Sequence, residues 1–215
     1  MQEKARTVAI ARNYEELLRI DSSISAARIV IGPLVRSFER HKNNGVNPGG
    51  WVERSASVSR YAYIGTEALV LEHARIGFGV SLSGKSVVTG MSSIHSLPGI
   101  SRKQPSVTIE NSWIGGESRI QAYLPGNSIA ISGSMITGQT SLSAFNCRMK
   151  IDNSLLAGKL ILRGNMVVIN SCITGTGKIL SAEIICTNLS GKVGISAMHA
   201  SANTESITEA IAARR

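Results

Sequence analysis

Aliphatic residues recur with a period of six between Trp51 and Ile100. Counting in sixes along this stretch gives an unbroken series: Val52, Val58, Ile64, Val70, Ile76, Leu82, Val88, Ile94 and Ile100. An amphipathic helix has a period of 3.6 and an alternating strand a period of 2, so neither explains the series. A coil of three short strands does, because each hexad then supplies one side of the coil and one inward aliphatic side chain. We therefore expect Val52, Val70 and Val88, which are three hexads apart, to stack inside the coil.

A second, mostly small position repeats in the same frame, four places after the aliphatic positions. Ala56, Ala62, Ala68 and Ala74 occupy this place first, and Val80, Ser86 and Ser92 follow. A small side chain lets the backbone turn a tight corner. The low aromatic content of 4% and the 21 glycines suit the same narrow, frequently turning coil.

A longer repeat takes over after the basic loop Ser101–Pro105. Each unit ends with a glycine, and these are Gly116, Gly138, Gly158, Gly175 and Gly191. Successive closing glycines are therefore 22, 20, 17 and 16 residues apart. These lengths are typical of single coils in a parallel β-solenoid. The pattern predicts that the solenoid continues with coils that shorten toward the C-terminus. Asn111 and Asn153 hold matching places where asparagine tolerates a left-handed backbone.

Both ends of the chain depart from these repeats. The N-terminal part predicts a short strand over Thr7–Ala11, a helix over Tyr14–Ile20 and a polar, exposed stretch over Glu39–Gly45. The C-terminal stretch Thr204–Ala212 predicts a short helix with a capping box at its start. An open solenoid end exposes a full rung of unpaired backbone groups, so we interpret both ends as caps.

The sequence thus predicts an all-β fold, a single-chain parallel β-solenoid that is left-handed in its hexapeptide part at least over residues 52–100. We divide the chain into an N-terminal capping segment of mixed structure (1–46), a hexapeptide-repeat solenoid (47–100), a longer-coil continuation (101–198) and a C-terminal helix and tail (199–215).

The entry into the first hexad resembles a known group. Asn47-Pro48-Gly49-Gly50 is a turn signal that leads into Trp51-Val52. This Gly-Gly-Trp-aliphatic entry, followed by hexads ending in alanine, resembles the bacterial hexapeptide-repeat proteins of the YdcK type over residues 47–95. The resemblance implies the fold and says little about chemistry.

Hexapeptide acyltransferases share the repeat, and they supply the alternative function. Their resemblance implies acyl-CoA as the cofactor and a histidine base, for which His73 and His95 are the candidates. Both should face outward, where a histidine is more commonly a solvated surface residue than a base. Glu72 is a poor partner for His73, because neighbours in extended backbone point apart. We therefore predict no catalytic residues, no metal site and no cofactor.

Charge gives the main indication of a partner. The 23 lysines and arginines exceed the 14 acids, for a formal net charge of +9. The predicted binding residues are Arg102, Lys103, Arg148, Lys150, Lys159, Arg163, Lys178 and Lys192. A stripe of such residues favours an acidic protein, a polyanion or an acidic polysaccharide over a small metabolite. The alternative is ordinary solubilising charge on glycine-containing turns.

The remaining expectations concern location and assembly. The three cysteines lack metal or redox spacing, which favours free thiols in a reducing compartment. No stretch has the length and hydrophobicity of a signal peptide or membrane span. We expect a cytoplasmic protein of bacterial or phage origin, with non-classical secretion or a phage particle left open, that forms homo-oligomers through its flat sides.

Overall fold

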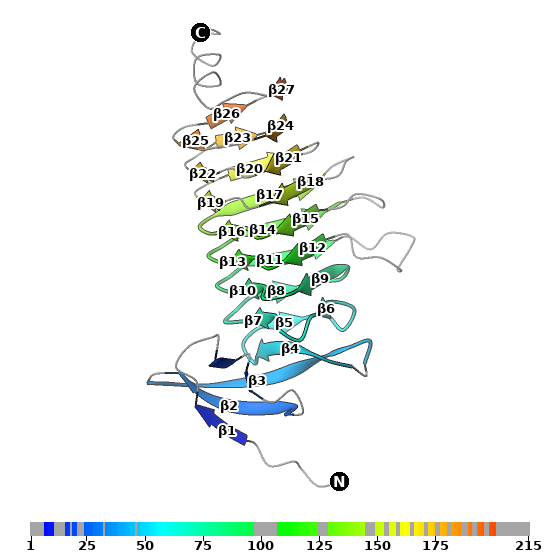
Figure 1. Ribbon diagram of the computed structural model, residues 1–215, viewed down its shortest axis with the longest axis vertical. Coiled ribbons are helices and arrows are strands. Elements are labelled where there is room, and N and C mark those ends of the chain that lie inside the picture. The colour runs from blue at the N-terminus through cyan, green and yellow to red at the C-terminus, as the bar shows by residue number, and fades with distance from the viewer. Residues whose placement is uncertain are drawn as a thin grey trace.

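The computed structural model describes residues 7–10, 16–17, 19–20, 24–31, 33–45, 47–96, 107–123 and 129–144, and the strands between Met149 and Ala200. These residues form an all-β, mostly parallel solenoid built of three long sheets (Figure 1). Successive strands visit the three sheets in turn, so each sheet receives one strand from every coil.

Sheet A is 11-stranded and includes the N-terminal strands, whereas sheets B and C are 8-stranded. In spatial order, sheet A contains β1 (Thr7–Ile10), β2 (Ala26–Ile31), β3 (Leu34–Asn43), β4 (Asn47–Glu53), β7 (Leu69–Val70), β10 (Val87–Val88), β13 (Trp113–Ile114), β16 (Met135–Ile136), β19 (Leu155–Ala157), β22 (Cys172–Thr174) and β25 (Leu189–Ser190). Sheet B contains β5 (Ser57–Val58), β8 (Arg75–Ile76), β11 (Ser93–Ser96), β14 (Arg119–Ala122), β17 (Thr140–Ala144), β20 (Leu160–Arg163), β23 (Gly177–Ile179) and β26 (Val193–Ile195). Sheet C contains β6 (Tyr63–Ile64), β9 (Val80–Ser83), β12 (Val107–Glu110), β15 (Ile129–Ser132), β18 (Met149–Asp152), β21 (Met166–Ile169), β24 (Ala182–Ile185) and β27 (Met198–Ala200).

The aliphatic residues of the hexads stack inside the solenoid as predicted. Val52 pairs with Val70, and Val70 pairs with Val88. Val70 and Val88 are fully buried, and Val52, in the lowest coil, packs against the same core. Ile76 and Ile94 form the equivalent column in sheet B. Each parallel pair therefore joins positions three hexads apart.

The longer repeat continues the same three sheets. Ile114 pairs with Ile136, Ile136 with Leu156, Leu156 with Ile173 and Ile173 with Leu189. The differences between these residue numbers, 22, 20, 17 and 16, equal the spacings between the closing glycines. The predicted shortening of the coils is thus confirmed. Asn111 has a φ of 46°, in the left-handed region expected for it.

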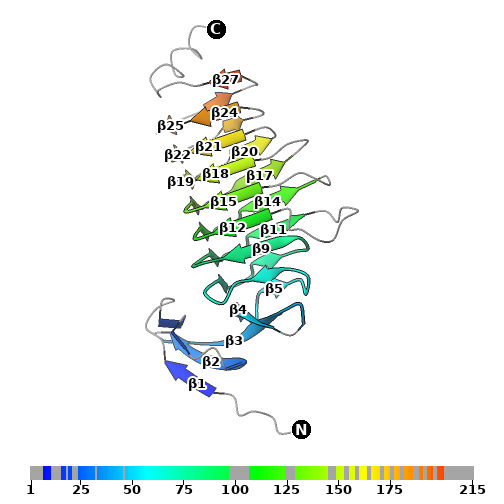
Figure 2. The same ribbon diagram turned by 45° about the vertical axis from the view of Figure 1, so that its right-hand side comes forward.

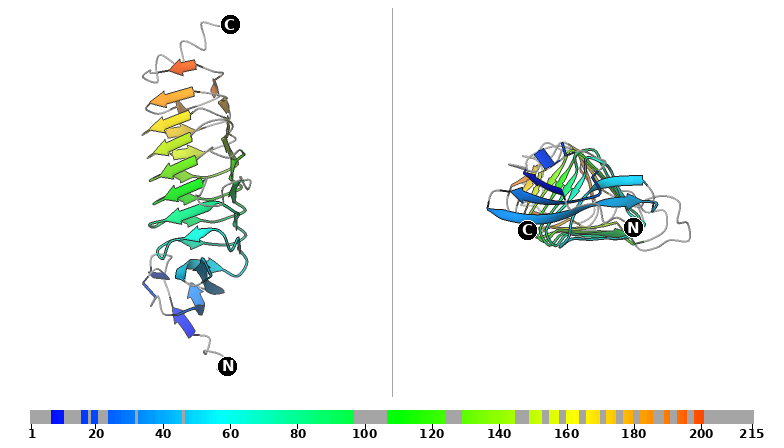
Figure 3. Two further views of the ribbon diagram at one scale, coloured as in Figure 1. Left: turned by 90° about the vertical axis from the view of Figure 1, so that its right-hand side faces the viewer. Right: turned by 90° about the horizontal axis from the view of Figure 1, so that it is seen from below.

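The N-terminal strands extend sheet A below the first coil. β2 pairs with β3, and β3 with β4, in the antiparallel sense, whereas β1 and β2 are parallel. Figures 2 and 3 show this cap beneath the stacked coils. The strand predicted over Thr7–Ala11 is confirmed as β1. Of the predicted helix, Glu16 and Leu17 form a helical turn, and several of its other residues lie outside the described ones.

The expectation that Glu39–Gly45 is exposed was wrong for part of that stretch. β3 runs through to Asn43, and both Arg40 and Asn43 are buried. The side-chain amide of Asn43 imitates a peptide group, since Nδ2 donates to the Ile64 carbonyl and Oδ1 accepts from the Ile64 N–H, each at 2.8 Å. His41 Nε2 lies 3.1 Å from the Ala62 carbonyl oxygen. These side chains satisfy backbone groups at the lower edge of sheet C.

Arg40 joins the cap to the first coil. Its guanidinium donates to the backbone carbonyls of Gly49, Thr66 and Ile20 at 3.1 to 3.3 Å. It also lies over the Trp51 ring, 4.1 Å from the centroid. A buried cation needs such compensation, because its desolvation is costly. The Gly-Gly-Trp entry therefore places the Trp51 ring against the guanidinium of Arg40.

The C-terminal helix predicted over Thr204–Ala212 lies outside the described residues. Within the part of the chain that the structure describes, no helix is long and apolar enough to cross a membrane.

Candidate functional site on the outer face of sheet B

The residue before each inward aliphatic faces outward, and its character differs between the three sheets. In the first coils this place holds Trp51, Leu69 and Val87 on sheet A, Ser57, Arg75 and Ser93 on sheet B, and Tyr63 and Ser81 on sheet C. Sheet A thus presents an apolar column, sheet B a polar and basic one, and sheet C a mainly polar one. These columns define three chemically distinct outer faces.

Two outward columns run along sheet B. The first contains, in register, Ser57, Arg75, Ser93, Arg119 and Ser141. The second contains His95, Gln121 and Ser143, which pair in the same order. The described strands of sheet B contain no aspartate or glutamate. We call the surface formed by the residues of these two columns the basic face.

Arg75 and Arg119 are the exposed cations of the basic face. The ion pair found among the described residues joins Arg36 to Glu53, and neither Arg75 nor Arg119 takes part in one there. Two guanidiniums that form no ion pair with a described residue, on strands without an acid, create a positive potential over that surface. The basic face is therefore suited to bind anionic groups.

His95 is the centre of a hydrogen-bonded group in the second column. The Gln121 side-chain nitrogen lies 2.9 Å from His95 Nε2, and Tyr123 donates from its hydroxyl to Gln121 Oε1. Because an amide nitrogen only donates, His95 Nε2 accepts, so the neutral ring carries its proton on Nδ1. Below it, a Cβ on Gly77 would lie 2.5 Å from His95 Cβ. The glycine therefore leaves room for the Cβ of His95 in the coil above.

Partial burial lowers the pKa of His95 below its ordinary value of 6.5, and the nearby Arg119 guanidinium lowers it further. The unfolded chain therefore binds a proton at this residue before the folded chain does. Stability from this source is complete above pH 6.5 and is lost as the pH falls from there toward the folded-state pKa.

We expect the unfolding free energy of the wild-type protein to decrease between pH ~7.5 and pH ~5.5, and that of His95→Asn to decrease less. Urea unfolding at both pH values measures the difference. His41, whose pKa is also lowered by burial, contributes with the same sign in both proteins and so serves as an internal control. An identical pH dependence in the two proteins would contradict the assignment.

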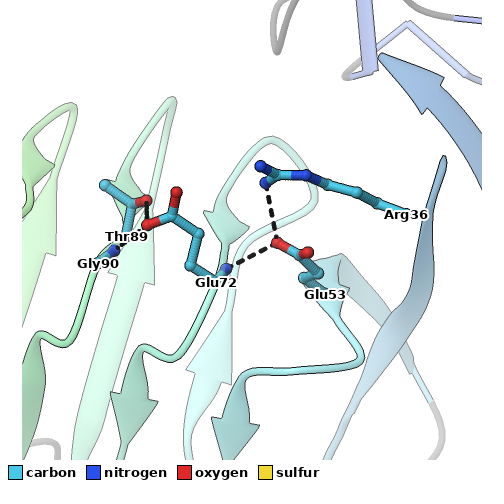
Figure 4. A network of polar contacts seen from close by, with 5 residues as sticks. All are labelled: Arg36, Glu53, Glu72, Thr89 and Gly90. Carbon is cyan, nitrogen blue, oxygen red and sulfur yellow. Dashed lines mark hydrogen bonds and ion pairs between the residues drawn. The ribbon is translucent and has the colours of Figure 1, made fainter. Parts of the chain in front are cut away.

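His73 has a different environment at the corner between sheets A and B. Its side chain is exposed, and its neighbour Glu72 is engaged elsewhere. Glu72 has a φ of 57°, and its carboxylate accepts hydrogen bonds from the Thr89 hydroxyl at 2.9 Å and the Gly90 N–H at 2.7 Å (Figure 4). Its own N–H donates to Glu53, which also pairs with Arg36. Glu72 therefore ties three successive coils together, and it does not orient His73.

The predicted binding residues divide between two sheets. Arg163 follows Ser143 in register, and Lys178 follows Ile161, so both lie on strands of sheet B. Lys150 pairs with Ala130 on sheet C. The other predicted residues, which are Arg102, Lys103, Arg148, Lys159 and Lys192, lie outside the described ones. Of the three that can be placed, two thus share a sheet with Arg75 and Arg119.

Sequence reasoning missed Arg75, Arg119, Gln121 and Tyr123. A signal for the first of them was present in the hexads. The residues directly before Val58, Ile76 and Ile94, which are three hexads apart, are Ser57, Arg75 and Ser93. This polar series differs from the apolar series of sheet A. The periodicity of the outward residues therefore indicates the chemical character of each outer face, just as the periodicity of the aliphatic residues indicates the core.

Among the described residues, no group of three or more histidine, cysteine, aspartate or glutamate side chains is arranged to hold a metal ion. Comparisons of the chain with protein-family models, with curated proteins and with solved structures found no match.

Proposed function

We propose that this protein is a non-catalytic β-solenoid that binds an acidic partner through the basic face. The observation that carries the proposal is the pair of exposed arginines, Arg75 and Arg119, on strands that contain no acid. Arg163 and Lys178 continue the same sheet by register. The basic character thus extends along the solenoid axis and is not confined to one coil.

The spacing of these residues favours an extended polymer. Neighbouring strands of a sheet lie about 4.8 Å apart, so Arg75 and Arg119, two coils apart, repeat at roughly 10 Å. Ser93, His95 and Gln121 place hydroxyl, imidazole and amide groups beside them. Such a flat array suits the carboxylates and hydroxyls of an acidic polysaccharide. The described strands of sheet B carry no phenylalanine, tyrosine or tryptophan for nucleic-acid bases to stack on, and the nearby Tyr123 donates its hydroxyl to Gln121.

Binding should therefore depend steeply on salt. We expect the affinity for a polyuronate to fall as NaCl rises from low to physiological concentration, because each neutralised carboxylate releases a counterion. Fluorescence anisotropy with a labelled polyuronate measures this dependence, and single-stranded DNA and polyglutamate serve as competitors. Failure to bind the polyuronate at low salt would contradict the proposal. Stronger competition by polyglutamate would identify an acidic protein as the partner instead.

The second candidate function is acyl transfer from acyl-CoA. The observation in its favour is His95, whose lowered pKa keeps the imidazole neutral, in the form that a general base requires. Its hydrogen-bond partner is the amide of Gln121, which does not stabilise an imidazolium as a carboxylate would. Acyl-CoA retained on the purified protein, together with activity lost in His95→Ala or His73→Ala, would establish this function in place of binding.

Three finer attributes belong to the same proposal. We propose that the hexapeptide part winds with a left hand, as the hexads predict, and that the chain is related to the YdcK-type proteins. The Gly49-Gly50-Trp51 entry and the hexads ending in alanine that follow it support the latter. We also propose a cytoplasmic location, supported by the absence of cysteine spacing typical of disulfide frameworks.

A further inference from the structure

The outward column of sheet A is apolar along the solenoid. Trp51, Leu69, Val87, Trp113 and Met135 follow one another in register. Leu155 and Cys172 occupy the next two register positions. We call this series the apolar column. Because the sheet A strands of the coils are short, this column supplies the only outward position on most of them.

The cap covers the lower part of the apolar column. Trp51 and Leu69 are fully buried and Val87 is 8% exposed, in one cluster with cap residues. The cap members of that cluster are Leu17, Ala27, Ile29 and Phe38, with Ile20 and Ile24 packed against it. Trp113 and Met135, in the next two coils, are 36% and 49% exposed. The same column is therefore a hydrophobic interface in its lower part and partly exposed to solvent at Trp113 and Met135.

The charge distribution indicates what packs against the part of the apolar column at Trp113 and Met135. Strands β10, β13, β16, β19 and β22 contain no charged residue, in contrast to sheet B with its arginines and sheet C with Glu110 and Lys150. An acidic partner would find no cation to pair with on these strands. Two copies of a chain with a net charge of +9 repel one another, and an uncharged face is where they approach at least cost. The same column in a second copy also has the same spacing of about 4.8 Å.

We propose that a second copy of this chain covers the upper part of the apolar column, with Trp113 and Met135 at the centre of the contact. A twofold arrangement with the two solenoids antiparallel fits the shape of the chain. The N-terminal cap lies at the lower end (Figure 1), so antiparallel copies bring their upper parts together while these caps lie at opposite ends. The contact is isologous, so the same residues serve on both sides.

Sedimentation velocity of the full chain over a range of micromolar concentrations tests the interface. The wild type should form a dimer, and Trp113→Ser with Met135→Lys should raise its dissociation constant at least about tenfold. Tyr61→Ser with Met91→Lys is the matched control, because these residues are 53% and 67% exposed and lie outside the apolar column. This control should dimerise like the wild type. Met135→Lys alone gives the same answer should the double variant fail to fold, as judged by circular dichroism.

Added salt separates this contact from binding at the basic face. An apolar interface persists as NaCl rises, whereas polyanion binding weakens. A wild-type chain that stays monomeric at the highest concentration would overturn the proposal, and so would a double variant that dimerises as tightly as the control. Neither result would affect the test of polyuronate binding. That test changes other residues, and polyuronate affinity falls as salt rises.

Discussion

Replacing Gly50 with alanine should destabilise this protein by about 3 kcal/mol or more. The backbone of β4 lies close to that of residues 65–68, so a Cβ at residue 50 would lie 2.5 Å from the Gly65 carbonyl oxygen and nearer still to that of Ala68. Both obstacles are backbone atoms of the turn between β6 and β7, so they cannot rotate away as a flexible side chain can. The Ala68 carbonyl also accepts the Trp51 N–H at 3.1 Å, and that bond would be strained. Urea unfolding followed by circular dichroism measures the loss.

Gly45→Ala provides the control for this prediction. Gly45 has a φ of 77°, but nothing lies within 4 Å of a Cβ placed there. Its replacement therefore costs only the left-handed backbone conformation, about 1 to 2 kcal/mol. Equal losses in the two variants would show that close approach at the entry to the first coil is not what requires Gly50.

Reversing both arginines of the basic face, by Arg75→Glu with Arg119→Glu, should abolish measurable binding of a polyuronate at physiological salt. Each substitution removes one cation and introduces a carboxylate that repels the ligand. Removing a cation that contacts the polymer also lowers the slope of log affinity against log salt by about one. Both side chains are exposed, so the fold should be retained. Anisotropy titrations at several salt concentrations measure the affinity and the slope.

Lys42→Glu with Lys85→Glu makes the same change in net charge at exposed positions outside the basic face. Its affinity should fall only slightly, through the weakened long-range attraction. If both double variants lose affinity to the same extent, the net charge of the chain and not the basic face determines binding. The comparison therefore decides whether the arrangement of Arg75 and Arg119 matters.

The solenoid core was predictable because its rule is local. One aliphatic residue per hexad points inward wherever it stands, so the stacking of Val52, Val70 and Val88 followed from counting. The closing glycines gave the coil lengths for the same reason, since Gly116 and Gly138 hold equivalent left-handed positions, with φ of 73° and 78°. Periodicity in the sequence thus determined the register of parallel strands throughout the described coils.

The cap was less predictable because its polar residues are satisfied by partners far along the chain. Arg40 donates to the carbonyl of Thr66, and Asn43 pairs with Ile64, both more than twenty residues away. Nothing in the local stretch Glu39–Gly45 distinguishes such residues from solvated ones. Their burial becomes evident only when β3 is laid across the first coil.

The candidate site was found in part. Counting basic residues selected Arg163 and Lys178, which do lie on sheet B, but it also selected Lys150 on sheet C. Because the coil length changes from 22 to 16 residues, basic residues at a constant spacing along the chain do not all fall on the same sheet. Arg75 could not be assigned by counting basic residues, because within the hexads it is a single outward residue that precedes the inward Ile76. Faces of a solenoid are therefore best assigned after the register is known.

The position of the cap determines how this chain can fold while it is being synthesised. The N-terminal strands and the first coil, which β3, Arg40 and Asn43 join, leave the ribosome before any later coil. Each new coil then has an edge of parallel strands on which to pair, so we expect nascent coils to add in the order of their synthesis. Growth in this direction keeps only the most recent edge open to misassociation. A chain with its cap at the opposite end would expose its first edge until translation was complete.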